Sequence, residues 1–280
     1  MEIIKKDSTY PQKKEAEMEI PKFHPDIQKI MEIPIKIDPW TYNQIGKRND
    51  GPFKDNYQRL EIRECGEKMV DINLLGLSGE DYYFSKFANR KDILTKKWIS
   101  KKVFLRKTHV ERLVKADKYF KKRGLFLHIV SGWRHPELQK IIKEDYAKKF
   151  GCEKADRVFA STDRKVPATH STGGSFDIEL RDLTRKEKIG MDVYYKNEKI
   201  PSLYWAEELF NEDKLDSINK EIVKRRRILY HGLCTEKVIF EKNEDTFTAH
   251  PGEYWHYGDG DTLSAYLKKE SFIRYGIIYP

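Results

Sequence analysis

The sequence predicts an α+β fold in which a small antiparallel sheet is flanked by helices. Strand and helix patterns alternate up to residue 151, and strand patterns then dominate around 176–180 and 247–257. Strands and helices that segregate in this way are typical of α+β domains. The chain has 280 residues, of which 39% are hydrophobic, so it can bury a substantial core without disulfide or metal staples.

The N-terminal segment differs in composition from the rest of the chain. Its charges show little periodicity, and it holds about half of the 11 prolines, namely Pro11, Pro21, Pro25, Pro34, Pro39 and Pro52. Proline and charge without apolar periodicity favour an extended or partly disordered chain. We therefore expect residues 1–55 to form an extended arm, either laid over a single domain at 56–280 or partly disordered.

The first regular elements of the domain are a strand, a helix and a second strand. The segment KMVDINLL at 68–75 predicts a strand. Apolar residues at helical spacing over 109–124 predict a helix that stops at Gly124. The apolar run LFLHIV at 125–130 then predicts a short buried strand.

Two further helices are expected. In the first, Pro136 suits the first turn and Gly151 suits the C-terminal cap. The second is indicated by helical spacing of Leu215, Ile218, Ile222 and Leu229. It also carries the densest basic run of the chain, which we expect to form the solvated face of an amphipathic helix. That run is Lys224, Arg225, Arg226 and Arg227.

Composition restricts the location and the partners of the protein. The three cysteines form neither a CxxC pair nor a disulfide framework, which favours a reducing compartment. No apolar run has the length of a signal peptide or of a membrane span, so we expect a cytoplasmic protein. The net charge is +9, but the basic residues are interleaved with acidic ones. We therefore expect no nucleic-acid partner.

Two stretches have residues of the kind that bind zinc. In ATHSTGGSFD at 168–177, a turn-like STGG separates His170 from Asp177, and a hairpin can bring the two side chains together. A catalytic zinc takes three protein ligands from such residues and leaves one position for water. The alternative is that His170 ends a strand and Asp177 only hydrogen-bonds the turn. The following FDIEL alternates, so Asp177 and Glu179 should share one face of a strand.

The second stretch, PGEYWHYGDGD at 251–261, places Glu253 three residues before His256 among strong β-formers. A strand or bulge here can put His256 on a metal and Glu253 beside the water bound to that metal. The alternative is an aromatic strand that contains a histidine and a glutamate by chance. For the other candidate histidines we expect packing or surface roles. They are His109, His128, His135, His231 and His250.

These motifs resemble the signatures of the zinc D-alanyl-D-alanine dipeptidases, the group that includes the vancomycin-resistance dipeptidases. HSTGGSFD resembles S-x-H-x-x-G-x-A-x-D, and EYWH resembles E-x-W-H. SGWRHPELQ resembles the family segment with an essential arginine, and RRRILYHGL resembles the helix before the glutamate motif. The order and spacing agree over about residues 70–280, and the arm lies outside the resemblance.

The resemblance implies a fold similar to the zinc D-Ala-D-Ala peptidase and hedgehog fold, and it makes 56–280 the catalytic domain. It implies one Zn²⁺ per chain, held by His170, Asp177 and His256. Glu253 becomes the general base, and Arg134 becomes the group that stabilises the oxyanion. The alternative for Arg134 is a surface arginine that caps the following helix.

Two positions depart from the family pattern. Ala168 stands where the family has a serine that helps to hold the substrate, and Ser175 stands where it has an alanine. Thr169 or Ser171 can supply a hydroxyl nearby.

The function implied by the resemblance is hydrolysis of a small dipeptide, D-alanyl-D-alanine first, in the cytoplasm. One alternative is a related D,D- or L,D-carboxypeptidase acting on peptidoglycan peptides, although the lack of a signal peptide counts against it. Another is a non-catalytic binding module stabilised by zinc. Glu253 and Arg134 count against that module, because a structural zinc site needs neither. The sequence does not predict an oligomeric state.

Overall fold

The centre of the fold is a mixed five-stranded sheet with the order β3-β5-β6-β10-β9. Its strands are β3 (Ser78–Gly79), β5 (Leu125–Ser131), β6 (Ser175–Asp182), β10 (His256–Gly258) and β9 (Thr248–Ala249). The computed structural model describes residues 21–47, 51, 60–96, 98–159, 167–236, 238–242 and 244–279. It confirms the α+β class. The sheet is antiparallel except at its edge, where β3 runs parallel to β5.

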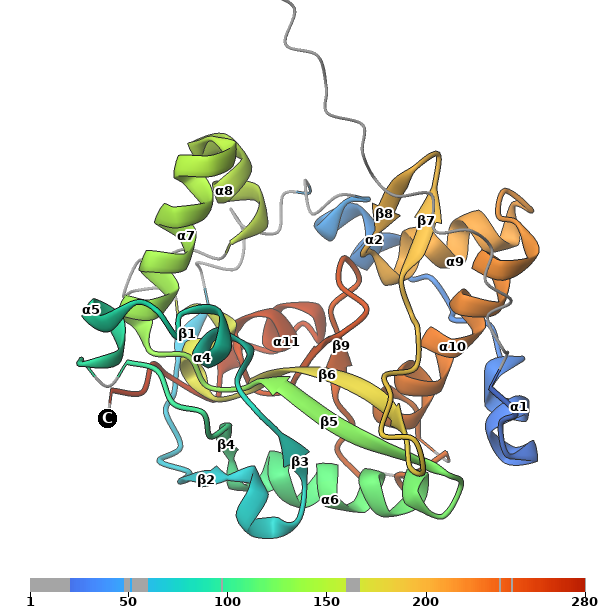
Figure 1. The fold of residues 1–280 in the computed structure, drawn as a ribbon, viewed down its shortest axis with the longest axis horizontal. Coiled ribbons are helices and arrows are strands. Elements are labelled where there is room, and N and C mark those ends of the chain that lie inside the picture. The colour runs from blue at the N-terminus through green and yellow to red at the C-terminus, as the bar shows by residue number, and fades with distance from the viewer. Residues whose placement is uncertain are drawn as a thin grey trace, which may run out of the picture.

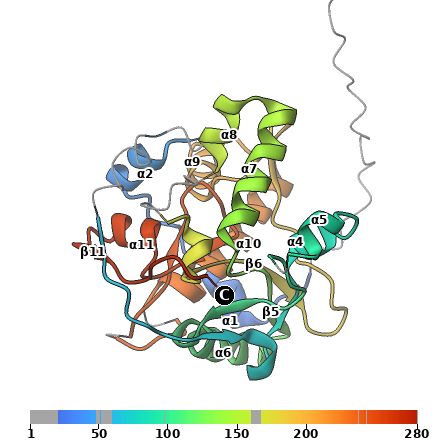
Figure 2. The ribbon, with the colours of Figure 1, turned by 90° about the vertical axis from the view of Figure 1, so that its left-hand side faces the viewer.

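The sheet separates the main apolar core from a polar face. Helix α6 (Lys107–Lys121) lies along one side of β5 and β6, as Figures 1 and 2 show from two directions. Ile178 and Leu180 are fully buried in the same apolar cluster as Leu113 of α6. Because side chains alternate along a strand, Asp177 and Glu179 point to the opposite face. The alternation expected for this segment is confirmed.

At one end of the sheet, helices stand on the side opposite α6, as Figure 1 shows. They are α4 (Tyr82–Lys86), α5 (Lys91–Leu94), α7 (Pro136–Phe150) and α8 (Cys152–Val158). A small apolar cluster of Phe87, Ile93, Leu138 and Ile142 joins α5 and α7. Helix α7 has Pro136 in its first turn and ends at Gly151, as predicted from the sequence.

The hairpin of β7 (Val193–Tyr195) and β8 (Glu198–Ile200) lies at the other end. It shares a second apolar cluster with α9 (Leu203–Asn211) and α10 (Ser217–Cys234). Outside the N-terminal segment, the other elements are β1 (Glu61–Ile62), β2 (Met69–Asp71), the 3₁₀ turn η2 (Ile72–Leu75), β4 (Phe104–Arg106), the 3₁₀ turn η3 (Thr169–Thr172), α11 (Thr262–Leu267) and β11 (Phe272–Ile273). Strand β1 pairs with β11, and β2 pairs with β4.

The strand expected at 68–75 is shorter than predicted. Only Met69–Asp71 pairs with β4, and Ile72–Leu75 forms a 3₁₀ turn. The Asp71 carboxylate accepts a hydrogen bond from the Asn73 backbone N–H at 3.1 Å. This local cap turns the chain out of the strand, a competition that aspartate side chains commonly create.

The described part of the N-terminal segment, at 21–47 and 51, contains two short helices where we expected an extended chain. They are α1 (Pro25–Met31) and α2 (Pro39–Ile45), and each has a proline at its first position. Ile27, Ile30 and Met31 are buried, and α1 packs on α10. Most of the expected boundary near residue 55 lies outside the described residues.

The prediction of a solvated basic face on α10 is wrong for three of its four residues. Arg225, Arg226 and Arg227 are buried. Arg226 donates to the carbonyl oxygens of Met191, Ser202 and Ile200 at 2.7 to 3.1 Å. Acceptors from distant segments replace water around the guanidinium groups of Arg226 and Arg227. The run is therefore no exposed phosphate-binding patch.

Candidate metal centre

Three segments that are distant in sequence meet at one end of β6. His170 lies in η3, Asp177 lies in β6 and His256 opens β10. Strands β6 and β10 pair so that His256 and Asp177 are directly opposite each other. Gly173 ends η3 with φ of 70°, a conformation that glycine adopts without strain. This tight turn, and not the expected hairpin, brings His170 back to Asp177.

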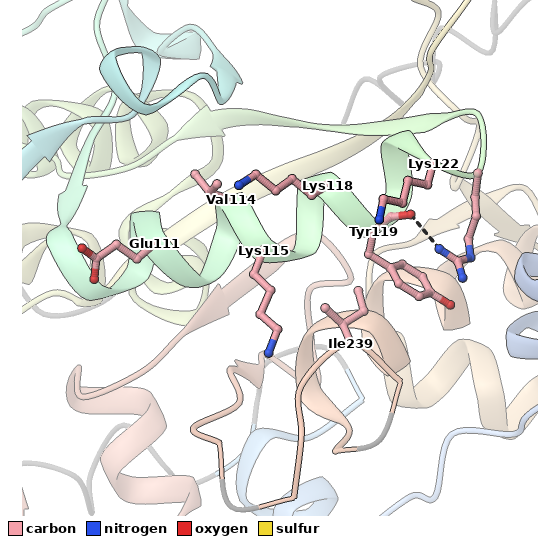
Figure 3. A pocket seen from close by; sticks show the side chains of 8 residues that line it. Glu111, Val114, Lys115, Lys118, Tyr119, Lys122 and Ile239 are labelled. Atoms are coloured by element: carbon pink, nitrogen blue, oxygen red, sulfur yellow. Dashed lines mark hydrogen bonds between the residues drawn. The ribbon is translucent and has the colours of Figure 1, made fainter.

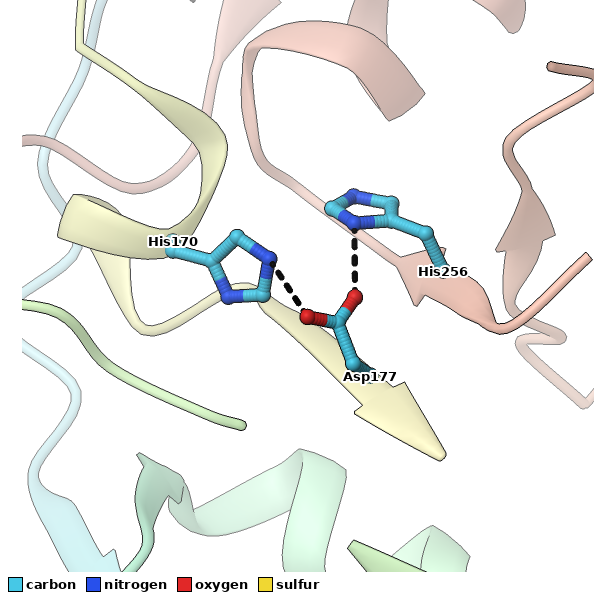
Figure 4. Close-up of side chains that lie close together, drawn as sticks. All are labelled: His170, Asp177 and His256. Atoms are coloured by element: carbon cyan, nitrogen blue, oxygen red, sulfur yellow. Dashed lines mark hydrogen bonds and ion pairs between the residues drawn. The ribbon is translucent and has the colours of Figure 1, made fainter. Parts of the chain in front are cut away.

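The three side chains converge on one point, as Figure 4 shows. His170 Nε2 lies 3.5 Å from one Asp177 carboxylate oxygen, and His256 Nδ1 lies 3.1 Å from the other. Potential ligand atoms of the three residues all lie within 4.8 Å of one another. Two ligands about 2.1 Å from a tetrahedral zinc are about 3.4 Å apart, so the donor set fits such an ion.

The protonation of the cluster also suits a metal. Burial lowers the pKa of His170 to about 4, so the ring is neutral at pH 7. Burial alone would raise the pKa of Asp177, but both histidines outweigh it and the pKa lies below its usual range. Burial alone would lower the pKa of His256, but the hydrogen bond to Asp177 outweighs burial, so the pKa lies above its usual value. A metal therefore meets an ionised carboxylate and a neutral His170 ring.

Backbone contacts fix the orientation of His170. Its Nδ1 donates to the Gly132 carbonyl at 2.8 Å, which leaves Nε2 to face Asp177. In return the Arg134 backbone N–H donates to the His170 carbonyl at 3.1 Å. A Cβ on Gly132 would lie 2.6 Å from the Phe104 carbonyl oxygen, so only glycine fits this loop. The loop and the histidine thus hold each other in place.

Glu253 lies beside the cluster, in a turn before β10 and not in the expected strand. Its backbone N–H donates to His250, and the His256 backbone N–H donates to Glu253. One Glu253 carboxylate oxygen lies 4.0 Å from His256 Nδ1. The turn therefore places a partly exposed carboxylate next to the point where the three ligands meet.

Arg134 is buried in the site and is not a surface arginine. Its two terminal nitrogens donate to Gln139 at 2.6 Å and to Ser131 at 3.2 Å. The second also lies 4.0 Å from Asp177. Its Nε has no hydrogen-bond partner among the described residues. Two hydrogen bonds thus hold the guanidinium in a fixed plane.

Sequence reasoning missed Tyr83. The Arg134 guanidinium lies over the Tyr83 ring, 4.3 Å from its centroid. Burial raises the pKa of Tyr83, and the charges of Asp177 and Glu253 raise it further, so the hydroxyl stays protonated. Tyr83 lies in the motif D-Y-Y-F, where Asp81 caps α4 by accepting from the Tyr83 backbone N–H. No local pattern distinguishes such an aromatic residue from one of the core.

Neither serine of the HSTGGSFD stretch is exposed. Ser171 and Ser175 are buried, and neither side-chain oxygen has a hydrogen-bond partner among the described residues. Among the other histidines, His250 lies closest to the cluster, with its ring 5.4 Å from that of His256. Its Nδ1 accepts from the Gly252 backbone N–H at 2.9 Å, which supports the Glu253 turn.

A groove of about 400 Å³ adjoins the cluster and includes Asp177 and Tyr83 in its lining. A second groove, along α6 on the other side of the sheet, is lined by lysines and Glu111 (Figure 3). It contains none of the candidate site residues. Within the described part of the chain, no helix combines the length and apolar character needed to cross a bilayer.

Comparisons with known proteins show little similarity. No family model matches the chain, and no curated protein matches it. Among solved structures, the chain is similar to the LdcB LD-carboxypeptidase, a structure described as revealing the molecular basis of peptidoglycan recognition. The identity is 19%, the match covers 61% of this chain and 71% of that one, and the TM-score is 0.32. Similarity this low does not establish a shared activity.

Proposed function

We propose that this protein is a zinc-dependent peptidase that hydrolyses the D-alanyl-D-alanine bond. The observation that carries the proposal is the convergence of His170, Asp177 and His256 beside a carboxylate and a fixed guanidinium. A structural zinc site needs neither of these last two groups. The motif resemblance supplies the choice of substrate.

Each residue has a role that its geometry supports. His170, Asp177 and His256 hold the ion, which when bound supplies a Lewis acid and a water of lowered pKa. Glu253 accepts a proton from water and returns it to the departing amine. Arg134 stabilises the negative charge on the carbonyl oxygen of the scissile bond, held in position by Ser131 and Gln139.

An amine-release assay tests the proposal. The substrates are D,D-, L,D- and L,L-dipeptides and longer peptides that end in D-Ala-D-Ala, with the protein either zinc-loaded or stripped by a chelator. We expect hydrolysis of the D-Ala-D-Ala bond that depends on zinc and returns when zinc is restored. Zinc-loaded protein that hydrolyses none of these peptides contradicts the proposal.

A D,D- or L,D-carboxypeptidase is the second candidate, and the groove beside Asp177 favours it. A site for a dipeptide alone needs little room beyond the metal cluster. The groove of about 400 Å³ is within the size range of sites that bind larger ligands. The same assay distinguishes the two candidates, because it compares the dipeptide with longer peptides that have the same final bond.

A further inference from the structure

The two nitrogens of the His256 ring have different surroundings. Nδ1 donates to the Asp177 carboxylate at 3.1 Å. Nε2 is buried and has no hydrogen-bond partner among the described residues. A buried ring nitrogen without a partner is costly. When Nδ1 of a neutral histidine binds a metal, the proton is on Nε2, so a metal centre needs an acceptor on that side of the ring.

Gly258 leaves room for a carboxylate beside His256. It follows His256 by two positions in β10, so both residues belong to the same face of the strand. Across the sheet Gly258 pairs with Ser175, just as His256 pairs with Asp177. A Cβ on Gly258 would lie 2.1 Å from Oδ2 of Asp261 and 2.9 Å from Oγ of Ser175. The Asp261 carboxylate therefore occupies the place of a side chain at position 258, on the face that carries the metal ligands.

The two oxygens of Asp261 have separate surroundings. The residue is 1% exposed and precedes α11. Oδ1 caps this helix by accepting from the backbone N–H groups of Leu263 and Ser264, at 2.8 and 3.2 Å. Oδ2 is the oxygen that faces Gly258. Burial raises the pKa of Asp261, and the strongest opposing effect is the charge of His256. The carboxylate and the imidazole therefore attract each other within one buried space.

We propose that Asp261 is a positioning residue of the metal centre, whose carboxylate accepts from Nε2–H of His256 and keeps Nδ1 directed at the metal. In the structure Nδ1 bonds Asp177. A bound ion replaces that bond, and the ring then takes Asp261 as its second partner. Carboxylates outside the ligand set orient metal-binding histidines in this way and strengthen their binding. The inference rests on the metal site of the proposed function and adds a residue to its support.

Zinc affinity, measured by competition with a coloured chelator, tests the inference without any substrate. Asp261→Asn keeps the size of the side chain and an oxygen to cap α11, but it removes the charge. We expect this variant to bind zinc about 10- to 100-fold more weakly, the loss typical of a group that orients a metal ligand. Co²⁺ bound in place of zinc should show shifted d–d absorption bands, because the geometry at His256 changes. The melting temperature of the metal-free protein should change little.

Two further variants separate this role from capping of the helix. Asp261→Ser keeps a good N-cap residue but is too short to reach His256, so its zinc affinity should fall at least as far. Asp71→Asn is the matched control, because Asp71 is also a buried capping aspartate but lies outside the metal cluster. It should bind zinc like the unsubstituted protein. An unchanged zinc affinity in both Asp261 variants, or an equal loss in Asp71→Asn, overturns the inference.

The outcome for Asp261 is separable from the outcome for the peptidase function. Hydrolysis by the unsubstituted protein, together with unchanged zinc affinity in the Asp261 variants, overturns only the role of Asp261. Weaker zinc binding in these variants, without hydrolysis by the unsubstituted protein, overturns only the peptidase function. An unsubstituted protein that binds no zinc contradicts both.

Discussion

At the scale of single residues, His256 has the position expected of a metal ligand while its neighbour His250 does not. Purified protein should contain about one zinc per chain, and His256→Ala should lose most of it, because two remaining ligands hold the ion weakly. His250→Ala is the control and should keep the metal. Elemental analysis after dialysis measures the content. Full occupancy in His256→Ala would remove this residue from the ligand set.

Substitution of Glu253 tests catalysis separately from metal binding. The carboxylate lies 4.0 Å from His256 Nδ1 but outside the group of three ligands. Glu253→Gln should retain zinc and the fold while kcat falls by about a hundredfold or more, the loss expected for a general base. Zinc content and kcat are measured on one preparation. Activity within a few-fold of the original would assign the base to another group.

Arg134 tests whether a fixed guanidinium acts in the transition state. Arg134→Ala should lower kcat by about a hundred- to a thousandfold with little change in zinc content. Arg134→Lys should restore only part of the rate, since lysine keeps the charge but cannot bond both Ser131 and Gln139 in one plane. A purely structural arginine would instead lower the melting temperature and leave kcat per folded molecule unchanged.

At the scale of elements, the sequence predicted best the helices and strands that depend on residues close to them in the chain. Apolar spacing and terminal residues located α6 and α7, and the alternation of 176–180 gave the two faces of β6. The pairing of β6 with β10 could not be predicted, because their register joins residues 79 positions apart. The metal cluster depends on that register. The candidate ligands could therefore be identified from the sequence, but their convergence in space could not be derived from it.

The arginines of α10 also show that contacts between distant segments cannot be predicted from a local pattern. By composition alone, Arg225, Arg226 and Arg227 look like a solvated face. Their burial depends on acceptors that come from other elements, such as the carbonyl of Met191 and the carboxylate of Glu207. A single helix sequence contains no information about those partners.

The buried ion pair of Arg227 and Glu207 should stabilise the packing of α9, α10 and the N-terminal segment. The two side chains bond at 2.6 Å and are almost fully buried. Glu207 also accepts from the Ile35 backbone N–H, and Arg227 donates to the Met31 carbonyl. Glu207→Leu leaves a buried charge without its partner and should lower the free energy of unfolding by about 3 to 5 kcal/mol.

Urea denaturation measures this loss, with two comparisons. Adding Arg227→Met to Glu207→Leu should recover part of the stability, because the unpaired charge is then gone. Lys214→Ala, which breaks an exposed pair with Glu212, should cost less than about 1 kcal/mol. A loss in Glu207→Leu as small as that of the surface control would show that the buried pair contributes little.

At the scale of the whole molecule, His109 couples folding to pH. It is fully buried between α6 and the turn after β10, where its Nε2 donates to the Asp259 carbonyl at 3.0 Å. Its Nδ1 has no hydrogen-bond partner among the described residues. Burial, and then the nearby Arg112, lowers the pKa of His109 to about 3. The ring is therefore neutral in the folded state throughout the range in which proteins usually function.

The direction of the pH effect follows from this depressed pKa. In the unfolded chain a histidine has a pKa of about 6.5, so between about pH 6.5 and 3 the unfolded state binds the extra proton. Stability is present above that window and is lost as the pH falls through it. At pH 5 this one residue should lower the free energy of unfolding by about 2 kcal/mol relative to pH 7.5.

His109→Gln keeps a donor for the Asp259 carbonyl but does not titrate, so its loss of stability between pH 7.5 and 5 should be smaller by that amount. Urea denaturation of both proteins at the two pH values measures the difference, and equal losses would mean that another group carries the acid sensitivity.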